Sequence, residues 1–282
     1  MSTGTRIVRT LEQLRRQVAD WRAQGLRTAL VPTMGALHDG HLTLVRQGLR
    51  RADRVVVTIF VNPKQFGQGE DLERYPRDEK GDARKLKKAG ANLIYIPEKA
   101  MIYPEGFATT VSLAGPAKAG LEDKFRPHFF DGVTTIVAKL FIQAGCDYAM
   151  FGEKDYQQLK VVTRMAWDLD IATAVIGVET VREPDGLAMS SRNAYLSRNN
   201  RELAPLIHHC LTDAATAIAD GKPAAKATST VRRKLTNAGF KVDYLTARNA
   251  ETLQRLRSPS EPIRLLAAAW LGTTRLIDNI AV

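Results

Sequence analysis

Short apolar runs alternate with amphipathic stretches over the first two thirds of this chain. Apolar residues that recur three and four positions apart indicate helices, whereas short runs rich in β-branched residues indicate strands. One run, 55–61, is almost continuously apolar, as in a strand buried on both faces of a parallel sheet. The alternation predicts a doubly wound, Rossmann-like α/β fold. Its expected strands are 28–31, 55–61, 93–96, 147–151 and 174–178, and its expected helices are 11–23, 42–51, 78–89, 132–144 and 157–169.

The pattern changes after about residue 183. Two helical stretches, 201–219 and 224–238, come first, and three strand-like runs follow at 242–247, 263–269 and 275–280. Helices followed by strands favour a smaller α+β domain. We therefore expect two domains, with residues 1–183 forming the Rossmann-like domain and residues 184–282 forming the smaller one.

Composition is that of a globular protein: 44% of the 282 residues are hydrophobic and 25% are charged. No apolar run approaches the roughly 18 residues that a membrane span requires, and residues 1–6 lack the apolar core of a signal peptide. Cys146 and Cys210 lie far apart in the sequence and give no disulfide framework, which suits a reducing compartment. We expect a cytoplasmic protein without a membrane partner.

The formal net charge of +11 raises the possibility of nucleic-acid binding. Lys and Arg residues are nevertheless scattered over the expected polar faces of helices, where a solvated surface explains them. The aromatic residues that single-strand binding requires are not interleaved with them. We expect anionic small-molecule substrates and no nucleic-acid partner.

A glycine-containing turn with two histidines links the strand expected at 28–31 to the helix expected at 42–51. Backbone N–H groups and the helix dipole attract anions at such a helix N-terminus, which favours phosphate binding. His38 and His41 are three residues apart, so they share one face of the first helical turn and can donate hydrogen bonds to phosphate oxygens. The pattern resembles the histidine-x-glycine-histidine signature of nucleotidyltransferases and class I aminoacyl-tRNA synthetases. The turn reads Pro32-Thr33-Met34-Gly35-Ala36-Leu37-His38-Asp39-Gly40-His41.

Two other interpretations of the histidines stay open at this point. A zinc site requires three or four protein ligands, and the remaining histidines and cysteines show no matching spacing. A pair of solvated surface histidines is the stronger alternative.

Four further segments carry polar residues in loops or at the expected domain junction. The histidine turn after residue 31 and the loop after residue 151 both leave the carboxyl ends of expected strands, where ligands of doubly wound sheets bind. The segments are 60–66 (Phe-Val-Asn-Pro-Lys-Gln-Phe), 71–77 (Asp-Leu-Glu-Arg-Tyr-Pro-Arg), 152–158 (Gly-Glu-Lys-Asp-Tyr-Gln-Gln) and 185–193 (Asp-Gly-Leu-Ala-Met-Ser-Ser-Arg-Asn). Together with the histidine turn, they resemble the pantothenate synthetase (pantoate–β-alanine ligase) family, whose members join pantoate to β-alanine at the expense of ATP. The resemblance runs in order from about residue 32 to residue 196, and the last third of the chain carries little signature.

The resemblance implies an ATP-dependent ligase of pantothenate biosynthesis that forms a pantoyl adenylate and releases AMP and pyrophosphate. It also implies Mg²⁺ with ATP as substrate, and a homodimer. A pentacovalent phosphorus transition state gathers negative charge, so cations and N–H donors suit it. The predicted catalytic residues are His38, His41, Lys154 and Arg192. The predicted ATP-binding residues are Met34, Gly35, Ala36, Leu37, His38, Asp39, Gly40, His41, Gly152, Glu153, Lys154, Asp155, Val181, Met189, Ser190, Ser191 and Arg192.

Neutral amides suit the two hydroxyl groups of pantoate. Gln65 and Gln158 correspond to the pantoate-binding glutamines of the family, and Asn62 lies in the same loop as Gln65. The protein ligands of Mg²⁺ are not identified, although Asp82 is a candidate carboxylate near the metal. We further expect residues 185–192 to form a mobile lid that moves with the smaller domain and closes over ATP, with a hinge at 184–186.

Two departures from the family pattern stand out. The run 126–132 reads Arg-Pro-His-Phe-Phe-Asp-Gly where Arg-Pro-Gly-His-Phe is usual, so the histidine is shifted or replaced, and Glu179 stands where proline is usual. Two other functions stay open beside the ligase. One is nucleotidyl transfer to a phosphorylated small molecule, which would call for more cations near Gln65 and Gln158. The other is an RNA-binding relative of class I synthetases, for which strongly salt-dependent RNA affinity would be diagnostic.

Overall fold

A six-stranded parallel sheet forms the larger part of the computed structural model, which describes residues 4–67, 69–258 and 260–282. The strand order is β1-β4-β3-β2-β5-β6, so the direction of winding reverses between the neighbouring strands β2 and β5. The loops that follow these two strands therefore meet at the same edge of the sheet. The strands are β1 (Arg6–Val8), β2 (Thr28–Thr33), β3 (Arg54–Ile59), β4 (Leu93–Tyr95), β5 (Tyr148–Gly152) and β6 (Ala174–Val178).

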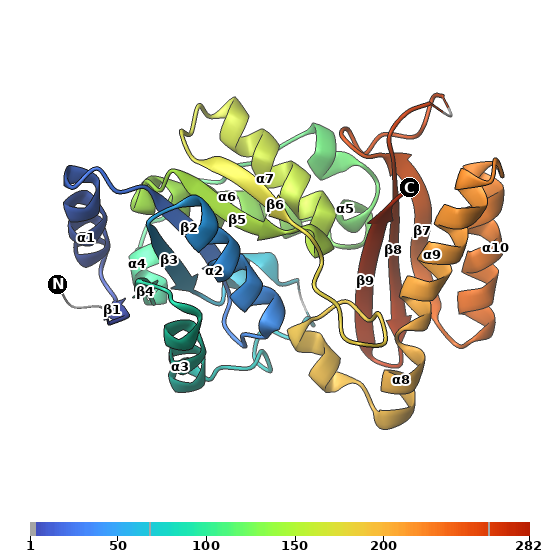
Figure 1. Ribbon diagram of the computed structural model, residues 1–282, viewed down its shortest axis with the longest axis horizontal. Coiled ribbons are helices and arrows are strands. Elements are labelled where there is room, and N and C mark those ends of the chain that lie inside the picture. Colours follow the sequence, from blue (N-terminus) through green and yellow to red (C-terminus); the bar gives the residue numbers. More distant parts are fainter. Residues whose placement is uncertain (1–3, 68, 259) are drawn as a thin grey trace.

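Helices cover both faces of this sheet (Figure 1). Successive residues of a strand point to opposite faces, and the core shows this directly: Leu30 packs with α1, α6 and α7, whereas Ala29 and Val31 pack with α2 and α3. The doubly wound α/β fold is thus confirmed. The helices are α1 (Leu11–Ala23), α2 (Asp39–Arg51), α3 (Glu79–Ala89), α4 (Lys99–Ile102), α5 (Glu122–Phe125), α6 (Phe129–Ala144) and α7 (Tyr156–Asp168), with 3₁₀ turns η1 (Pro63–Gln65), η2 (Gly115–Lys118) and η3 (Glu153–Asp155).

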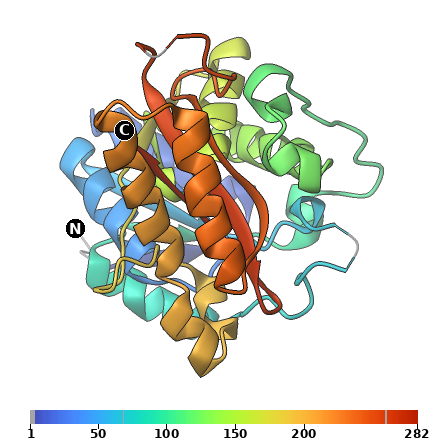
Figure 2. The same ribbon diagram turned by 90° about the vertical axis from the view of Figure 1, so that its right-hand side faces the viewer.

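The C-terminal part is a three-stranded antiparallel sheet covered by two helices on the face turned away from the parallel sheet (Figures 1 and 2). Its apolar core draws on residues from Leu187 to Leu276 and is separate from the two core clusters of the larger unit. The smaller α+β unit is thus confirmed as well. Its elements are η4 (Ser191–Tyr195), α8 (Arg198–Leu203), α9 (Leu206–Ala219), α10 (Ala224–Asn237), β7 (Lys241–Asn249), β8 (Ile263–Leu271) and β9 (Thr274–Ala281).

One expected helix is wrong in detail. The stretch 201–219 is broken in two, because α8 ends at Leu203 and α9 begins at Leu206, with Pro205 between them. Proline lacks the N–H that would continue the hydrogen-bond ladder of α8, and it suits the start of a helix. Short elements such as β1 and α5 carry too few residues to show a periodicity. Within the described residues, no helix combines the length and apolarity that crossing a membrane requires.

Candidate active site

The histidine turn after β2 is held in place by a buried carboxylate of α3. Gly35 and Ala36 adopt left-handed backbone angles, with φ of 85° and 52°. Asp82 is 1% exposed, and its two carboxylate oxygens accept hydrogen bonds from the backbone N–H groups of Ala36 (2.8 Å) and Leu37 (2.9 Å). Lys85 donates to the Leu37 carbonyl at 2.7 Å. Asp82 therefore fixes the turn. The suggestion that it lies near a metal stays a prediction.

His38 and His41 form the cap of α2 and fix each other's orientation. The Nδ1 atom of His38 accepts from the Gly40 N–H at 3.2 Å, and Nδ1 of His41 accepts from the His38 N–H at 3.4 Å. The ring centroids are 4.2 Å apart. Because each Nδ1 is an acceptor, each neutral ring carries its proton on Nε2, where it is free to donate to a ligand.

Burial lowers the pKa of His38 to about 4 and that of His41 to about 3. Desolvation is the main cause for both rings, since it disfavours the charged form. The positive charge of Lys154 lowers both values further, and His38 adds to the effect on His41. The two rings are thus neutral hydrogen-bond donors at pH 7.

We expect two of the five histidines to stay neutral between pH 8 and pH 5, in contrast to ordinary histidines with a pKa near 6.5. Ring ¹⁵N shifts of the ligand-free protein measure this, with His38→Gln and His41→Gln assigning the signals. The unfolded chain binds these two protons near pH 6.5 and the folded chain only near pH 4 and pH 3, so stability is expected to fall as the pH drops below about 6.5. A titration midpoint near pH 6.5 for either ring would contradict the conclusion that burial keeps both rings neutral.

Lys154 lies on the turn after β5, next to the histidine turn across the point where the strand order reverses. It is the middle residue of η3, and its side chain is 20% exposed. Its ammonium lies 3.8 Å from the Asp155 carboxylate. Glu153 points the other way, because its carboxylate accepts from Arg264 of β8 at 2.9 Å. Lys154 and Asp155 line the central cavity, whereas Glu153 pairs with the small sheet.

Gln65 is oriented by a buried asparagine in the loop after β3. Asn62 is 1% exposed and donates to the Gln65 side-chain oxygen (2.9 Å) and to the Gly132 carbonyl (3.1 Å). Tyr103 donates to the Asn62 oxygen at 2.7 Å. The amide of Asn62 is thus used within the protein, and Gln65, which lines the cavity, is the group left to meet a ligand.

Gln157 and Gln158 begin α7 and face different surroundings. Gln158 lines the cavity at an intermediate exposure. Gln157 is buried; it accepts from the Glu122 N–H at 2.9 Å and donates to Pro116 and Asp123, which anchors α5 and η2. Both residues border the cavity, but the Gln157 amide is engaged by these contacts, so Gln158 is the better candidate to contact a substrate.

The Ser190–Arg192 segment is tied to the loop between η1 and α3. Arg192 forms a two-point ion pair with Asp71 at 2.9 and 3.0 Å. Ser191 lies 3.4 Å from the hydroxyl of buried Tyr75, and Ser190 caps η4 by accepting from the Arg192 N–H. Burial alone would raise the pKa of Asp71, yet the hydrogen bond and charge of Arg192 hold it below its usual value.

The run 126–132, which departs from the family pattern, supports the neighbouring Gln65 loop. Arg126 pairs with Glu70 at 2.6 and 2.8 Å, donates to the Gln65 carbonyl at 3.0 Å and lies 3.8 Å from the centroid of the Phe129 ring. His128 is exposed, whereas Phe129 lines the cavity. The arginine therefore supports the Gln65 loop without the histidine. Glu179, the other departure, lines the cavity just after β6.

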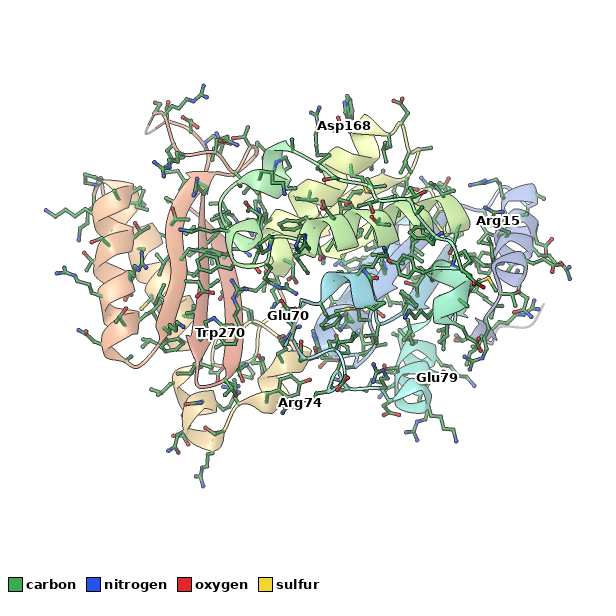
Figure 3. All side chains as sticks on the ribbon, turned by 180° about the vertical axis from the view of Figure 1, so that it is seen from behind. Arg15, Glu70, Arg74, Glu79, Asp168 and Trp270 are labelled. Atoms are coloured by element: carbon green, nitrogen blue, oxygen red, sulfur yellow. The ribbon has the colours of Figure 1, made fainter. Side chains whose placement is uncertain are left out.

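A cavity of about 1150 Å³ brings most of the predicted residues together, between the parallel sheet and the small sheet. The cavity lining does not include four predicted residues of the histidine turn: Gly35, Ala36, Leu37 and Asp39. The backbone of Ala36 and Leu37 is hydrogen-bonded to Asp82, and Asp39 is exposed to solvent. Figure 3 shows Glu70 and Trp270, which also line the cavity, on the two sides where the units face each other. The predicted residues that line it are Met34, His38, Gly40, His41, Gln65, Gly152, Lys154, Asp155, Gln158, Val181, Met189, Ser190, Ser191 and Arg192.

Sequence reasoning missed the partners that hold these residues in place. Asp71, Arg126 and Asn279 each contact a predicted residue from a distant part of the chain, and Glu70 pairs with Arg126. The segment 71–77 stands out in the sequence and Glu70 does not, and nothing in a single sequence indicates which arginine each carboxylate contacts.

Two loops at the switch point of a parallel sheet, one with a histidine cap and the other with a lysine, define an α/β enzyme that handles nucleotide phosphates. The chain belongs to the pantoate-beta-alanine ligase family, whose sequence profile matches residues 6–281. It is 57% identical to the pantothenate synthetase of Rhodopseudomonas palustris and 55% identical to that of Nitrobacter hamburgensis, and each alignment covers all of both chains.

Solved structures agree with this membership. The pantothenate synthetase of Thermus thermophilus is 43% identical, with a TM-score of 0.90 and coverage of 98% of each chain. The pantoate-beta-alanine ligase of Francisella tularensis, solved in complex with "Beta-gamma ATP" and β-alanine, is 31% identical, with a TM-score of 0.81 and coverage of 98% of this chain and 97% of that one. This chain is therefore a pantoate–β-alanine ligase by family and by fold.

Proposed function

We propose that this protein condenses pantoate with β-alanine at the expense of ATP, through a pantoyl adenylate. The pantoate carboxylate attacks the α-phosphorus of ATP and pyrophosphate leaves, which converts a poor leaving group into AMP. The amine of β-alanine then attacks the acyl carbon and expels AMP. One observation carries the proposal: the histidine turn, the lysine turn and both candidate pantoate glutamines line a single cavity in a chain of this family.

Charge that develops on the phosphate oxygens is met by donors from three directions. His38 and His41 offer neutral Nε2–H groups, Lys154 offers an ammonium, and the Ser190–Arg192 segment offers hydroxyl and guanidinium groups. Preorganised donors of this kind stabilise a transition state more than a ground state. Arg192 is paired with Asp71, so it reaches the phosphates only by sharing or exchanging that partner.

Mg²⁺ accompanies ATP in this proposal. In the described residues no group of three or more His, Cys, Asp or Glu side chains is arranged to hold a metal. Mg²⁺ is usually carried mainly by substrate phosphates, and Asp155, which lines the cavity beside Lys154, is a carboxylate that would help to hold it there. Bound there, Mg²⁺ would neutralise phosphate charge.

The test of the function is an assay for AMP and pyrophosphate. With ATP and pantoate alone, we expect at most about one equivalent of pyrophosphate per site, because the adenylate stays bound. Adding β-alanine should start steady release of AMP and pantothenate. AMP release that is independent of β-alanine, or transfer of AMP to a phosphorylated acceptor, would contradict the ligase. The relatives named above favour the ligase over nucleotidyl transfer.

Gln65→Ala and Gln158→Ala are expected to impair the use of pantoate and to leave ATP affinity nearly intact. Removing a partner from a buried hydroxyl costs about 1–3 kcal/mol, which corresponds to a rise of roughly 5- to 150-fold in the KM for pantoate. Calorimetry with each substrate measures this, with Gln17→Ala on α1 as the control. An equal loss of ATP affinity would remove the two residues from the pantoate pocket.

Residues 185–192 are proposed to close over ATP together with the smaller domain. The turn at 184–186 has the form of a hinge, since Gly186 has φ of 91° and donates to the Glu183 carbonyl at 2.8 Å. Closure protects the adenylate from water. Hydrogen exchange of 184–193 is therefore expected to slow when ATP and pantoate bind. Protection that is already maximal without ligand, and unchanged with it, would rule out the lid.

Three wider features complete the proposal. The domains are 1–183, which binds ATP and pantoate, and 184–282, supported by the separate apolar core of the smaller unit.

The protein is a cytoplasmic homodimer whose partners are small molecules and not nucleic acid. Exposed apolar side chains such as Ile142 and Trp167 are compatible with burial against a second copy. Light scattering during size-exclusion chromatography tests the dimer, and a gel shift with tRNA tests the absence of RNA binding.

A further inference from the structure

A group of buried polar side chains from the small sheet holds the turn that carries Lys154. Arg264 on β8 and Asn279 on β9 are 9% and 3% exposed. Leu266 pairs with Asn279 and Arg264 pairs with Ala281, so the two polar residues are diagonal neighbours on one face of the small sheet. That face is turned toward the parallel sheet, because Leu266 packs in the core of the larger unit.

The amide of Asn279 holds two consecutive carbonyl groups of η3. Its nitrogen donates to the carbonyl oxygens of Glu153 and Lys154, both at 2.9 Å. Its oxygen accepts from Nε of Arg264 at 2.7 Å, which leaves the NH₂ group facing the turn. A single side chain thus satisfies the backbone on both sides of the Lys154 Cα.

Arg264 closes the arrangement from the other side. Its Nη2 donates to the Glu153 carboxylate at 2.9 Å, and its guanidinium lies 4.0 Å from the centroid of the Tyr156 ring. Glu153 and Tyr156 lie on the two sides of Lys154 and Asp155. The turn has no side-chain cap of its own at Gly152 or Asp155, so much of its fixation comes from a sheet more than 100 residues later in the chain.

We propose that Asn279 and Arg264 are positioning residues for Lys154, so that docking of the small sheet sets the place of the lysine ammonium. This inference rests on the proposed function, in which Lys154 acts on the phosphates. A misplacement of about 1 Å in a reacting geometry can lower the rate by about 10²-fold. Contacts that fix the backbone of Lys154 are therefore expected to affect kcat.

A second inter-sheet ion pair provides a matched control. Arg275 on β9 pairs with Glu122 of α5 at 2.7 and 2.8 Å, and its side chain is 13% exposed, against 11% for Arg264. Both arginines join the two units, but Arg275 contacts Glu122 of α5 and Asp243 of β7, and not the lysine turn. Arg264→Lys and Arg275→Lys therefore each remove hydrogen bonds of a largely buried guanidinium, and only the first loosens η3.

The decisive experiment is a double-mutant cycle on the full chain with ATP, pantoate and β-alanine. Asn279→Asp keeps the shape and the acceptor for Arg264 but presents an oxygen to the two carbonyls. We expect it to lower kcat about 10- to 100-fold with little change in the KM for pantoate. In a Lys154→Ala background the same substitution should cause almost no further loss, because it acts through the missing ammonium.

If the Asn279→Asp variant does not fold, Arg264→Lys replaces it in the same double-mutant cycle with Lys154→Ala. Arg264→Lys should lower kcat. Arg275 borders the cavity without contacting η3, so Arg275→Lys should lower the melting temperature and change kcat far less than Arg264→Lys does. If Asn279→Asp and Arg264→Lys reduce kcat by the same factor with and without Lys154, the positioning role is wrong and the role of Lys154 stands. If Lys154→Ala keeps full kcat, both the role of Lys154 and this inference are overturned.

Discussion

Replacing Lys154 by alanine is expected to lower kcat by about 10²- to 10³-fold while changing the KM for ATP far less. The two histidines beside it are neutral at pH 7, since burial lowers the pKa of each to about 4 and about 3. Arg192 is already paired with Asp71. Lys154, with Asp155 at 3.8 Å, is therefore the cation best placed to meet charge that grows during adenylation. His41→Ala should cause a loss of similar size, because it removes an Nε2–H donor.

Steady-state AMP formation at saturating pantoate and β-alanine measures this effect. Lys160→Ala is the matched control, because Lys160 lies on α7, pairs with Glu251 at 2.7 Å and is not among the residues that line the cavity. It should keep wild-type kcat. If Lys154→Ala raised the KM for ATP with kcat unchanged, Lys154 would contribute to ground-state binding only, and the transition-state role would be abandoned.

The fold could be predicted where local pattern decides structure. The apolar run 55–61 indicates the strand β3, and the neighbouring strands are indicated by apolar runs of their own. Helix α1 begins and ends at the residues expected from its spacing, Leu11 and Ala23. The break at Pro205 shows the limit, because amphipathic periodicity continues through a proline that ends one helix and begins another. Neither the three residues of β1 nor the order of strands in the sheet follows from local pattern, since pairing depends on long-range packing.

The candidate site shows the same division. His38, Lys154 and Gln65 could be proposed from the sequence because they lie in loops at strand ends, have residue types that suit phosphate and hydroxyl groups, and match motifs of the family. Asp82 was named only as a candidate carboxylate near the metal, because any acid on a helix looks alike in sequence; its contacts with the Ala36 and Leu37 N–H groups show a structural task that the sequence does not indicate. Asn279 is 125 residues from Lys154, and no spacing rule connects them.

Among substitutions that add a single methyl group near the proposed pantoate site, Gly132→Ala is expected to disrupt the local structure most. An added Cβ would lie 2.1 Å from the carbonyl oxygen of Lys64 and 2.9 Å from the backbone nitrogen of Gln65. These are backbone atoms of the η1 turn, so no side chain can move aside. The first turn of α6 and the Gln65 loop must separate, which also strains the hydrogen bond from Asn62 to the Gly132 carbonyl. Overpacking of this kind typically costs about 1–3 kcal/mol of stability.

The functional consequence should exceed what the stability loss alone explains, because the displaced loop carries Gln65. We expect Gly132→Ala to raise the KM for pantoate at least about tenfold, a value that corresponds to about 1.4 kcal/mol of lost binding, while ATP affinity changes little. Gly48→Ala is the control: it too adds a Cβ on a buried helix face, but its neighbours are the side chains of Val55 and Ala29 at 3.1 and 3.4 Å. That variant should melt somewhat earlier and use pantoate normally. Equal pantoate KM values for the two variants, measured well below their melting temperatures, would show that contact between Gly132 and the η1 turn does not shape the pantoate pocket.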